Sequence, residues 1–351
     1  MRDNIKVLLV SKEFDAKDVD GIGRASYEIY THMGRIRSVG KLALKDFTGK
    51  YNNPLAQGLS KVFGEGRALK EVGRVRPDII HSMAPDHATM FKAHARLKVL
   101  KWNDMLVYDR LRHSSGLHWL KYRFKIALWE EAHRSADVFL DVSTQTQKER
   151  EAYFGSEKPS YVVADGLDDI FLKSKVWTGA RRDFVYVGSV EYRNKNIEGL
   201  LEFMSLFQKA GHEDAALHIF TSTHNAEELV SGSNAGGAAN VVVHKSAPDS
   251  VMMGYLSKAV ALAHMSTSEG FGIPILESMA SGTPVLTLKS AHIPEEVTRY
   301  AYKGSLEDLV GIAERLMERQ RPLEAKKVGY ARSFNWDNKV RDINRIYEKE
   351  L

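Results

Sequence analysis

The chain of 351 residues contains no cysteine, carries a net charge of +5 at pH 7, and consists of 43% hydrophobic and 27% charged residues. This is ordinary globular composition, and the length favours two domains. The lack of cysteine excludes a disulfide framework, a thiolate zinc site and a thiol nucleophile. No apolar run approaches the roughly 18 residues of a membrane span, and the N-terminus lacks the features of a signal peptide, so we expect a cytoplasmic protein.

The positive charge is concentrated in the N-terminal half of the chain. Residues 1–165 carry a net charge of +7, whereas the remaining residues carry −2. This asymmetry indicates an anionic partner on the N-terminal side, such as a phosphate group, a membrane surface or a nucleic acid.

In chain order, short apolar runs alternate with helical patterns. The first run, 5–10, has the composition of a buried parallel strand, and a loop with Gly21 and Gly23 leads from it into a helix over 24–33. Further strands and helices are predicted in turn at 55–75 (helix), 78–81, 99–102, 119–135 (helix), 138–142 and 161–163. Strands that alternate with helices indicate a parallel sheet covered by helices.

The same plan starts again at residue 184. Strands are predicted at 184–187, 217–220, 241–243, 260–263 and 284–288, and a helix at 196–210. We therefore expect an α/β protein with two doubly wound, Rossmann-like domains that face a cleft. The predicted bounds are 1–170 and 175–330 for the domains, with a polar linker over 173–179 and, within 331–351, a helix that crosses back to the first domain.

The most informative segment runs from Ser266 to Val285. Gly270 and Gly272 precede a helix N-terminus, where backbone N–H groups can face a ligand. Glu269 and Glu277 are eight residues apart, so both carboxylates can point to one cleft and accept hydrogen bonds from a diol. An exposed acidic helix face behind a glycine-rich cap explains the same spacing equally well.

This segment resembles the E-x7-E signature of the retaining glycosyltransferases of family 4, which have the GT-B fold. Other stretches similar to the family's motifs follow one another in the family's order along nearly the whole chain, at 20–24, 136–143, 164–171, 186–196 and 334–336. The resemblance implies a GT-B fold and the transfer of a sugar from a nucleotide diphosphate, GDP-mannose in preference to a UDP-sugar, to a glycan or lipid-linked acceptor.

The resemblance also implies roles for single residues. Glu277 would bind the ribose of the nucleotide, and Glu269 would contact the donor sugar. Lys195 would neutralise the charge that the diphosphate gains as it leaves. Asp104 is a candidate for a catalytic carboxylate on the opposite face of the sugar. The other residues that would bind the donor are Gly21, Gly23, Gly188, Ser189, Arg193, Gly270, Phe271 and Gly272. Asn103 and His118 would lie on the acceptor side.

The implied mechanism is a front-face substitution assisted by the leaving group, with no metal ion or cofactor. Asp18-Val19-Asp20 matches an Asp-x-Asp metal motif, but its place in the first loop disfavours that interpretation. Ser189 stands where the family often has arginine, Asn103 where it usually has histidine, and Asp165 where it usually has asparagine. The first two differences leave open whether the activity is reduced or redirected.

A basic and aromatic stretch in the N-terminal half suggests a second surface. Residues 92–125 hold nine Lys and Arg but only two Asp. A helix over 117–129 would carry two apolar stripes, formed by Leu117, Leu120, Phe124 and Leu128 and by Trp119, Tyr122, Ile126 and Trp129. Lys121 and Lys125 would share a face. Such a helix could contact an anionic membrane, on its inner face, or pack on the sheet as an ordinary amphipathic helix.

Three other functions compete with glycosyl transfer. A non-catalytic binder of nucleotides or glycans could use the same fold, but intact Glu269, Glu277 and Lys195 argue against it. A nucleotide-sugar epimerase is equally compatible with the fold. A nucleic-acid binder would explain the basic half, yet no recognition motif supports it.

Overall fold

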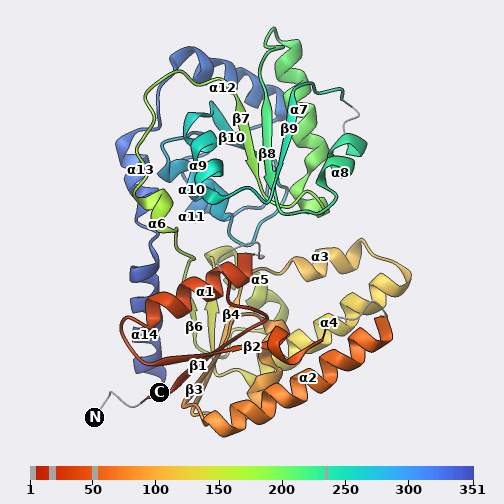
Figure 1. Ribbon diagram of the computed structural model, residues 1–351, viewed down its shortest axis with the longest axis vertical. Coiled ribbons are helices and arrows are strands. Elements are labelled where there is room, and N and C mark those ends of the chain that lie inside the picture. The colour runs from red at the N-terminus through yellow and green to blue at the C-terminus, as the bar shows by residue number, and fades with distance from the viewer. Residues whose placement is uncertain (1–4, 16–20, 50–53, 234–235) are drawn as a thin grey trace. The chain divides into compact units, whose positions relative to one another are not determined.

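The structure is a computed structural model that describes residues 5–15, 21–49, 54–233 and 236–351. The chain divides into an N-terminal unit, Met1–Gly166 with Trp336–Leu351, and a C-terminal unit, Leu167–Asn335. Each unit contains a six-stranded sheet in which all neighbouring strands are parallel, and helices cover both faces (Figure 1). The predicted doubly wound α/β class is therefore confirmed.

The sheet of the N-terminal unit has the order β2-β1-β3-β4-β5-β6. Its strands are β1 (Val7–Ser11), β2 (Val39–Ala43), β3 (Ile79–Ser82), β4 (Leu97–Trp102), β5 (Val138–Asp141) and β6 (Ser160–Val162). The helical segments are α1 (Gly21–Met33), η1 (Leu44–Phe47), α2 (Pro54–Val75), η2 (Pro85–Lys92), α3 (Leu106–Arg112), α4 (Gly116–Ser135), α5 (Thr144–Phe154) and α14 (Trp336–Glu350).

Side-chain alternation along β1 explains how this sheet is buried on both faces. Val7 and Leu9 pack in the cluster that holds α1 and α14, whereas Leu8 and Val10 pack in the cluster that holds α2, η2 and α4. The last helix, α14, contributes Val340, Ile343, Ile346 and Tyr347 to the first cluster. Because these residues are three or four positions apart, they form one apolar stripe, which places the end of the chain on the N-terminal unit.

The sheet of the C-terminal unit has the order β12-β11-β10-β7-β8-β9. Its strands are β7 (Phe184–Val187), β8 (Leu217–Thr221), β9 (Val241–Lys245), β10 (Ala261–His264), β11 (Val285–Leu288) and β12 (Tyr302–Gly304). The helical segments are α6 (Asp169–Leu172), η3 (Arg193–Lys195), α7 (Ile197–Lys209), α8 (Ala226–Ser233), α9 (Asp249–Lys258), α10 (Ile273–Ala280), α11 (Glu295–Thr298), α12 (Leu306–Arg319) and α13 (Ala325–Arg332).

Aromatic packing fixes α7 on one face of this sheet. The ring of Phe184 on β7 lies 5.4 Å from that of Phe203 and 4.9 Å from that of Phe207, both in edge-to-face geometry. The β7 and β10 strands are neighbours in the sheet. Their carboxyl ends therefore bring two loops together, 188–196 and 265–272, which hold most of the candidate residues.

Two strands and the linker differ from the prediction. The strands β2 and β12 were not predicted. The sequence of β2, Val-Gly-Lys-Leu-Ala, contains glycine and lysine and lacks a continuous apolar run, and β12 has only three residues. The stretch 173–179, predicted as a linker, belongs to the C-terminal unit, where Ser174 donates a hydrogen bond to the carbonyl of Ala280 at 3.4 Å. The division between the units falls after Gly166, before the predicted linker.

Candidate functional site

Two asparagines hold the loops after β7 and β10 against each other. The side-chain amide of Asn194 donates to the carbonyl of Ser268 at 3.0 Å, and that of Asn196 donates to the carbonyl of Met265 at 3.0 Å. In addition, the backbone N–H of Thr267 donates to the carbonyl of Asn194 at 2.8 Å. The η3 turn is thereby fixed beside the loop that carries Glu269.

This arrangement brings Lys195 and Glu269 into direct contact. The Nζ atom of Lys195 lies 2.8 Å from Oε1 and 2.9 Å from Oε2 of Glu269. Burial alone would raise the pKa of this carboxyl group. The contacts of the carboxylate with His264 and with the charged Lys195 outweigh burial and lower the pKa of Glu269 to about 2. Glu269 is therefore an ionised carboxylate inside the unit.

His264 is a member of this cluster that sequence reasoning missed. It is the last residue of β10, its side chain is buried, and its Nε2 atom lies 3.3 Å from Oε1 of Glu269. The ring of Tyr186 stacks beside it, with 6.5 Å between the ring centroids. The available signal was a single polar residue at the end of the apolar run Ala261–Ala263, five positions before Glu269.

Glu277 lies in α10, and its environment decides between the two explanations of the Glu spacing. Glu269 is 8% exposed and Glu277 is 4% exposed, so the two residues do not form an exposed acidic helix face. The helix begins after Gly272, whose φ of 99° is accessible to glycine at low cost. Gly270 and Phe271 occupy the same turn, which joins Glu269 to the N-terminus of α10.

The loop after β7 contains the other predicted donor residues. Gly188 has a φ of 149°, and a Cβ atom there would lie 3.0 Å from Oη of Tyr186. The hydroxyl group of Ser189 lies 3.2 Å from that of Thr223 and accepts a hydrogen bond from the N–H of Glu191. The side chain of Arg193 is exposed on η3. The loop thus presents one exposed cation, whereas Ser189 is engaged within the unit.

The remaining predicted residues belong to the N-terminal unit. Gly21 and Gly23 form the first turn of α1, and His118 is exposed on α4. Asp104 accepts a hydrogen bond from the N–H of Leu106 at 3.0 Å, which shapes the turn before α3. The Asp-x-Asp motif at 18–20 lies outside the described residues.

Asn103 is engaged by its own unit. Its side-chain carbonyl accepts a hydrogen bond from Lys101, and its amide donates to the carbonyl of Met83 at 2.9 Å. Both groups of the amide are therefore used within the N-terminal unit.

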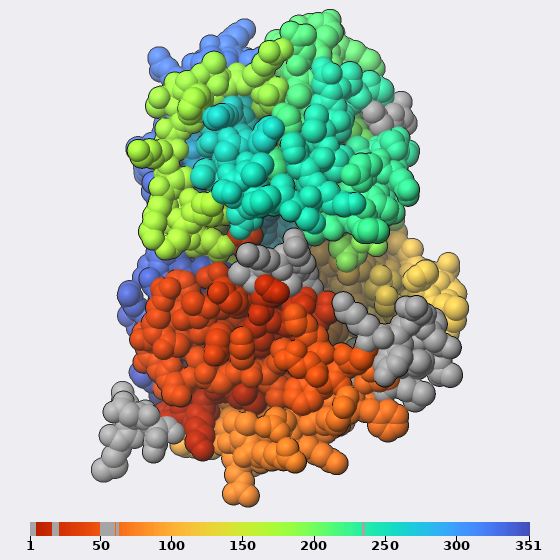
Figure 2. Space-filling model, in the orientation of Figure 1, coloured from red at the N-terminus to blue at the C-terminus, as the bar shows by residue number. Residues whose placement is uncertain are grey.

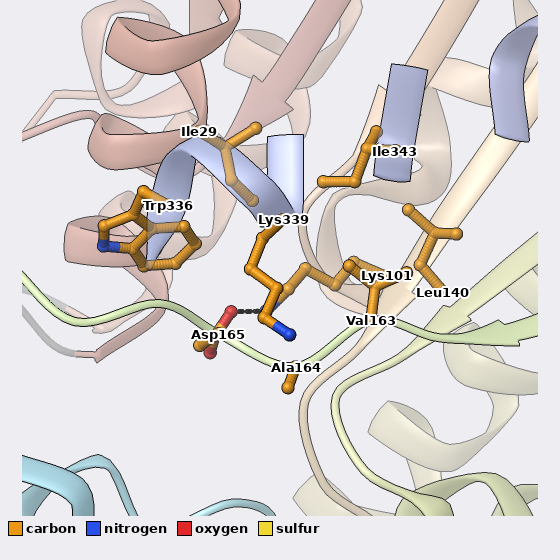
Figure 3. Close-up of a pocket in the computed structure, with 9 residues that line it drawn as sticks. All are labelled: Ile29, Lys101, Leu140, Val163, Ala164, Asp165, Trp336, Lys339 and Ile343. Atoms are coloured by element: carbon orange, nitrogen blue, oxygen red, sulfur yellow. Dashed lines mark ion pairs between the residues drawn. The ribbon is translucent and has the colours of Figure 1, made fainter. Parts of the chain in front are cut away.

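Lys101 also makes a buried ion pair that the sequence did not reveal. Its Nζ atom lies 3.0 Å from Oδ1 of Asp165, and both side chains are buried (Figure 3). The two residues line a small pocket beneath α14, together with Trp336 and Lys339. Asp165, which replaces the usual asparagine, thus fixes the chain after β6 to β4.

In the part of the chain that the structure describes, no three His, Asp or Glu side chains are grouped so as to hold a metal ion. Over that same part, none of the helices combines the length and the apolar character needed to cross a bilayer.

Comparison with known proteins shows what the C-terminal unit is similar to. Residues 169–327 match the family described as Glycosyl transferases group 1. The MMP alpha-(1->4)-mannosyltransferase of Mycolicibacterium hassiacum is 27% identical over 124 residues, which span 31% of this chain and only 30% of that protein.

Two solved structures match almost the whole chain. The sucrose-phosphate synthase of Thermosynechococcus elongatus has a TM-score of 0.77 at 15% identity and covers 99% of both chains. The glycosyltransferase WaaG, involved in lipopolysaccharide biosynthesis, has a TM-score of 0.69 at 13% identity and covers 96% of this chain and 99% of its own. The protein therefore has the GT-B fold, and within its C-terminal unit residues 169–327 are similar to the group 1 glycosyl transferases.

Proposed function

We propose that the protein is a retaining glycosyltransferase that uses a nucleotide-diphosphate sugar. The observation that carries the proposal is the Lys195–Glu269 pair, held at the carboxyl edge of the sheet in a group 1 domain. A lysine beside a carboxylate supplies both groups that the reaction needs, a cation for the diphosphate and an acceptor for sugar hydroxyl groups. Glu277 would bind the ribose from α10.

For the donor, we propose GDP-mannose, with a UDP-sugar as the second choice. Support comes from the mannosyltransferase with which part of this chain shares 27% identity, and from Ser189 and Arg193 in the loop after β7. Arg193 is exposed, so it is free to approach an anionic ligand, whereas Ser189 is engaged with Thr223. The acceptor would be a glycan or a lipid-linked sugar.

The proposed mechanism is a front-face substitution without a metal ion. The bond between the anomeric carbon and the diphosphate oxygen breaks, and the acceptor oxygen forms the new bond on the same face of the sugar. The leaving diphosphate takes the proton of the acceptor hydroxyl group. Lys195 and the N–H groups at Gly270, Phe271 and Gly272 would stabilise the developing charge. Asp104 stays the candidate for a carboxylate on the opposite face.

Product analysis tests this proposal directly. The purified protein is incubated with GDP-mannose or UDP-glucose and a panel of glycan acceptors in the presence of EDTA, and release of the diphosphate and the anomeric configuration of the new glycosidic bond are followed by NMR. An α-configured product from an α-configured donor supports retention without a metal. An inverted product, or a strict requirement for a divalent cation, contradicts the mechanism. Diphosphate binding without any turnover supports the non-catalytic binder instead.

We also propose that α4 contacts an anionic membrane, which would suit a lipid-linked acceptor. The stripe that faces away from the unit exposes Leu117 by 84%, Leu120 by 57% and Phe124 by 68%. In the other stripe Ile126 and Trp129 pack inward, whereas Trp119 is 44% exposed. In Figure 2 this part of the chain forms the yellow surface at the right-hand edge of the N-terminal unit. Exposed apolar side chains in such a group mark an interaction surface.

The charges beside this stripe indicate what covers it. Lys121 and Arg123 are exposed, and the Arg123 guanidinium lies 5.8 Å from the ring of Trp119. Lys125, one turn after Lys121 on the same face of α4, forms an ion pair with Asp86 at 3.0 Å. Apolar side chains flanked by cations match the surface of an anionic bilayer, in which acyl chains lie beneath anionic headgroups.

A further inference from the structure

The carboxylate of Glu269 is held from two sides by groups of very different mobility. Lys195 reaches it from the η3 turn with a flexible, partly exposed side chain. His264 reaches it from the end of β10, where its ring is 1% exposed within the packed sheet. The lysine can turn away by rotation of its side chain, whereas the imidazole is confined by its surroundings.

The proposed function sets these two contacts in competition. If Lys195 is to neutralise a leaving diphosphate, its Nζ atom must loosen the contacts of 2.8 Å and 2.9 Å that it makes with Glu269. When a buried carboxylate loses its cation, its negative charge strongly destabilises the folded protein, or the carboxylate takes up a proton. A protonated Glu269 would be a poorer acceptor for the hydroxyl groups of a sugar.

We propose that His264 is a positioning residue that keeps Glu269 ionised and in place when Lys195 turns to the diphosphate. Its Nε2 atom lies 3.3 Å from Oε1 without hydrogen-bond geometry while Lys195 holds the carboxylate, and a small shift of the carboxylate would let Nε2–H donate to it. Lys195 on η3 and Tyr186 on β7 are ionisable groups that face this pair. Burial, with the nearby charge of Glu269, raises the pKa of Tyr186, so this phenol stays neutral. A neutral hydroxyl group does not supply the positive charge of Lys195. The inference rests on the proposed diphosphate site.

Proton uptake on diphosphate binding distinguishes this role from a merely structural one. Binding of GDP, and of UDP, is measured by isothermal titration calorimetry at pH 7 in two buffers with different ionisation enthalpies. Wild-type protein should bind one diphosphate with no net proton uptake. His264→Leu should bind it at least about tenfold more weakly, or take up close to one proton per ligand, because Glu269 then loses the imidazole as well as the lysine.

Two conservative variants and a matched control complete the experiment. His264→Gln, whose amide N–H can stand where Nε2–H stands, should restore wild-type behaviour, whereas the shorter His264→Asn should resemble His264→Leu. His218→Leu, which removes a half-buried histidine from the neighbouring region of the sheet on β8, should behave as wild type. Circular dichroism melts identify any variant that does not fold.

Failure of the inference and failure of the proposed function give different results. If wild-type protein binds a diphosphate and all folded His264 variants bind it with equal affinity and no proton uptake, the role of His264 is overturned alone. If the wild type binds neither GDP nor UDP, the diphosphate site is overturned, and the inference falls with it.

Discussion

The Lys195 ammonium group lies within 2.9 Å of both carboxylate oxygens of Glu269, although the two residues are 74 positions apart in the chain. Adjacent parallel strands bring them together, since β7 and β10 end at the same edge of the sheet. The pair satisfies a buried carboxylate and at the same time presents a cation at that edge. This dual use of one lysine is the basis of the proposed transfer reaction.

Replacement of Lys195 tests that use. Lys195→Ala removes a fixed cation from the developing charge of the leaving group, so turnover should fall by about 100-fold or more, as for loss of one preorganised donor. The measurement is steady-state release of nucleoside diphosphate. Lys209→Ala, at the end of α7, is the control and should leave turnover unchanged. Wild-type turnover in Lys195→Ala would remove Lys195 from the site.

The Lys101–Asp165 ion pair should contribute to the stability of the N-terminal unit mainly through mutual neutralisation. Lys101→Met leaves the buried Asp165 carboxylate without its partner at 3.0 Å, which should lower the free energy of unfolding by about 3–5 kcal/mol. The double variant Lys101→Met/Asp165→Leu should recover most of that loss. Urea denaturation of the wild type, Lys101→Met, Asp165→Leu and the double variant measures the coupling, and additive losses would contradict it.

Burial of His81 should make the N-terminal unit sensitive to acid. Burial, with a contribution from the charge of Lys101, lowers the pKa of His81 from 6.5 to about 3. The unfolded chain therefore binds more protons than the folded one between these values, and stability is lost as the pH falls from 6.5 towards 3.

A His81→Gln variant isolates this effect. Between pH 7 and pH 5, its free energy of unfolding should change by about 2 kcal/mol less than that of the wild type, because the titrating group is gone. His94→Gln removes an exposed histidine and should keep the wild-type pH dependence. Identical pH profiles for His81→Gln and wild type would show that the buried ring does not titrate in this way.

Membrane contact by α4 predicts binding to anionic vesicles. In a flotation assay, wild-type protein should rise with vesicles that contain phosphatidylglycerol and stay behind with pure phosphatidylcholine, because Lys121 and Arg123 need anionic headgroups. Replacing Leu117, Leu120 and Phe124 together by serine should reduce binding at least about tenfold, given the apolar area lost.

A control separates this surface from apolar exposure in general. Val251→Ser on α9 changes an exposed apolar residue outside α4 and should leave vesicle binding unchanged. Wild-type protein that stays at the bottom of the gradient with both vesicle types would dispose of the membrane proposal. Donor sugar is absent from this assay, so its outcome does not bear on the transfer reaction.

The sequence predicted those features that depend on neighbouring residues. Apolar runs such as 184–187 identified ten of the twelve strands of the two sheets, because fully buried parallel strands are continuously hydrophobic. Glu269 and Glu277 were found together because only eight positions separate them. The strand β2 was not predicted, because Leu42 is its only buried residue and its sequence therefore lacks an apolar run.

Contacts between distant segments could not be predicted in the same way. Lys101 and Asp165 are 64 positions apart, and no local pattern shows that β4 and the chain after β6 meet. His264 looked like an ordinary strand residue until the loop after β10 placed Glu269 against it. The inward packing of one α4 stripe likewise depends on which face meets the sheet, since both stripes have similar composition.

Thermal stabilisation by nucleoside diphosphates tests the proposed donor site most directly. Wild-type protein is melted with GDP, UDP and ADP, beside Glu277→Ala and the exposed control Glu227→Ala on α8. A ligand that binds only the folded state raises the melting temperature by mass action. We expect a rise of several degrees with one diphosphate, GDP first, that is retained in Glu227→Ala and lost in Glu277→Ala. No rise with any of the three in the wild type would contradict it.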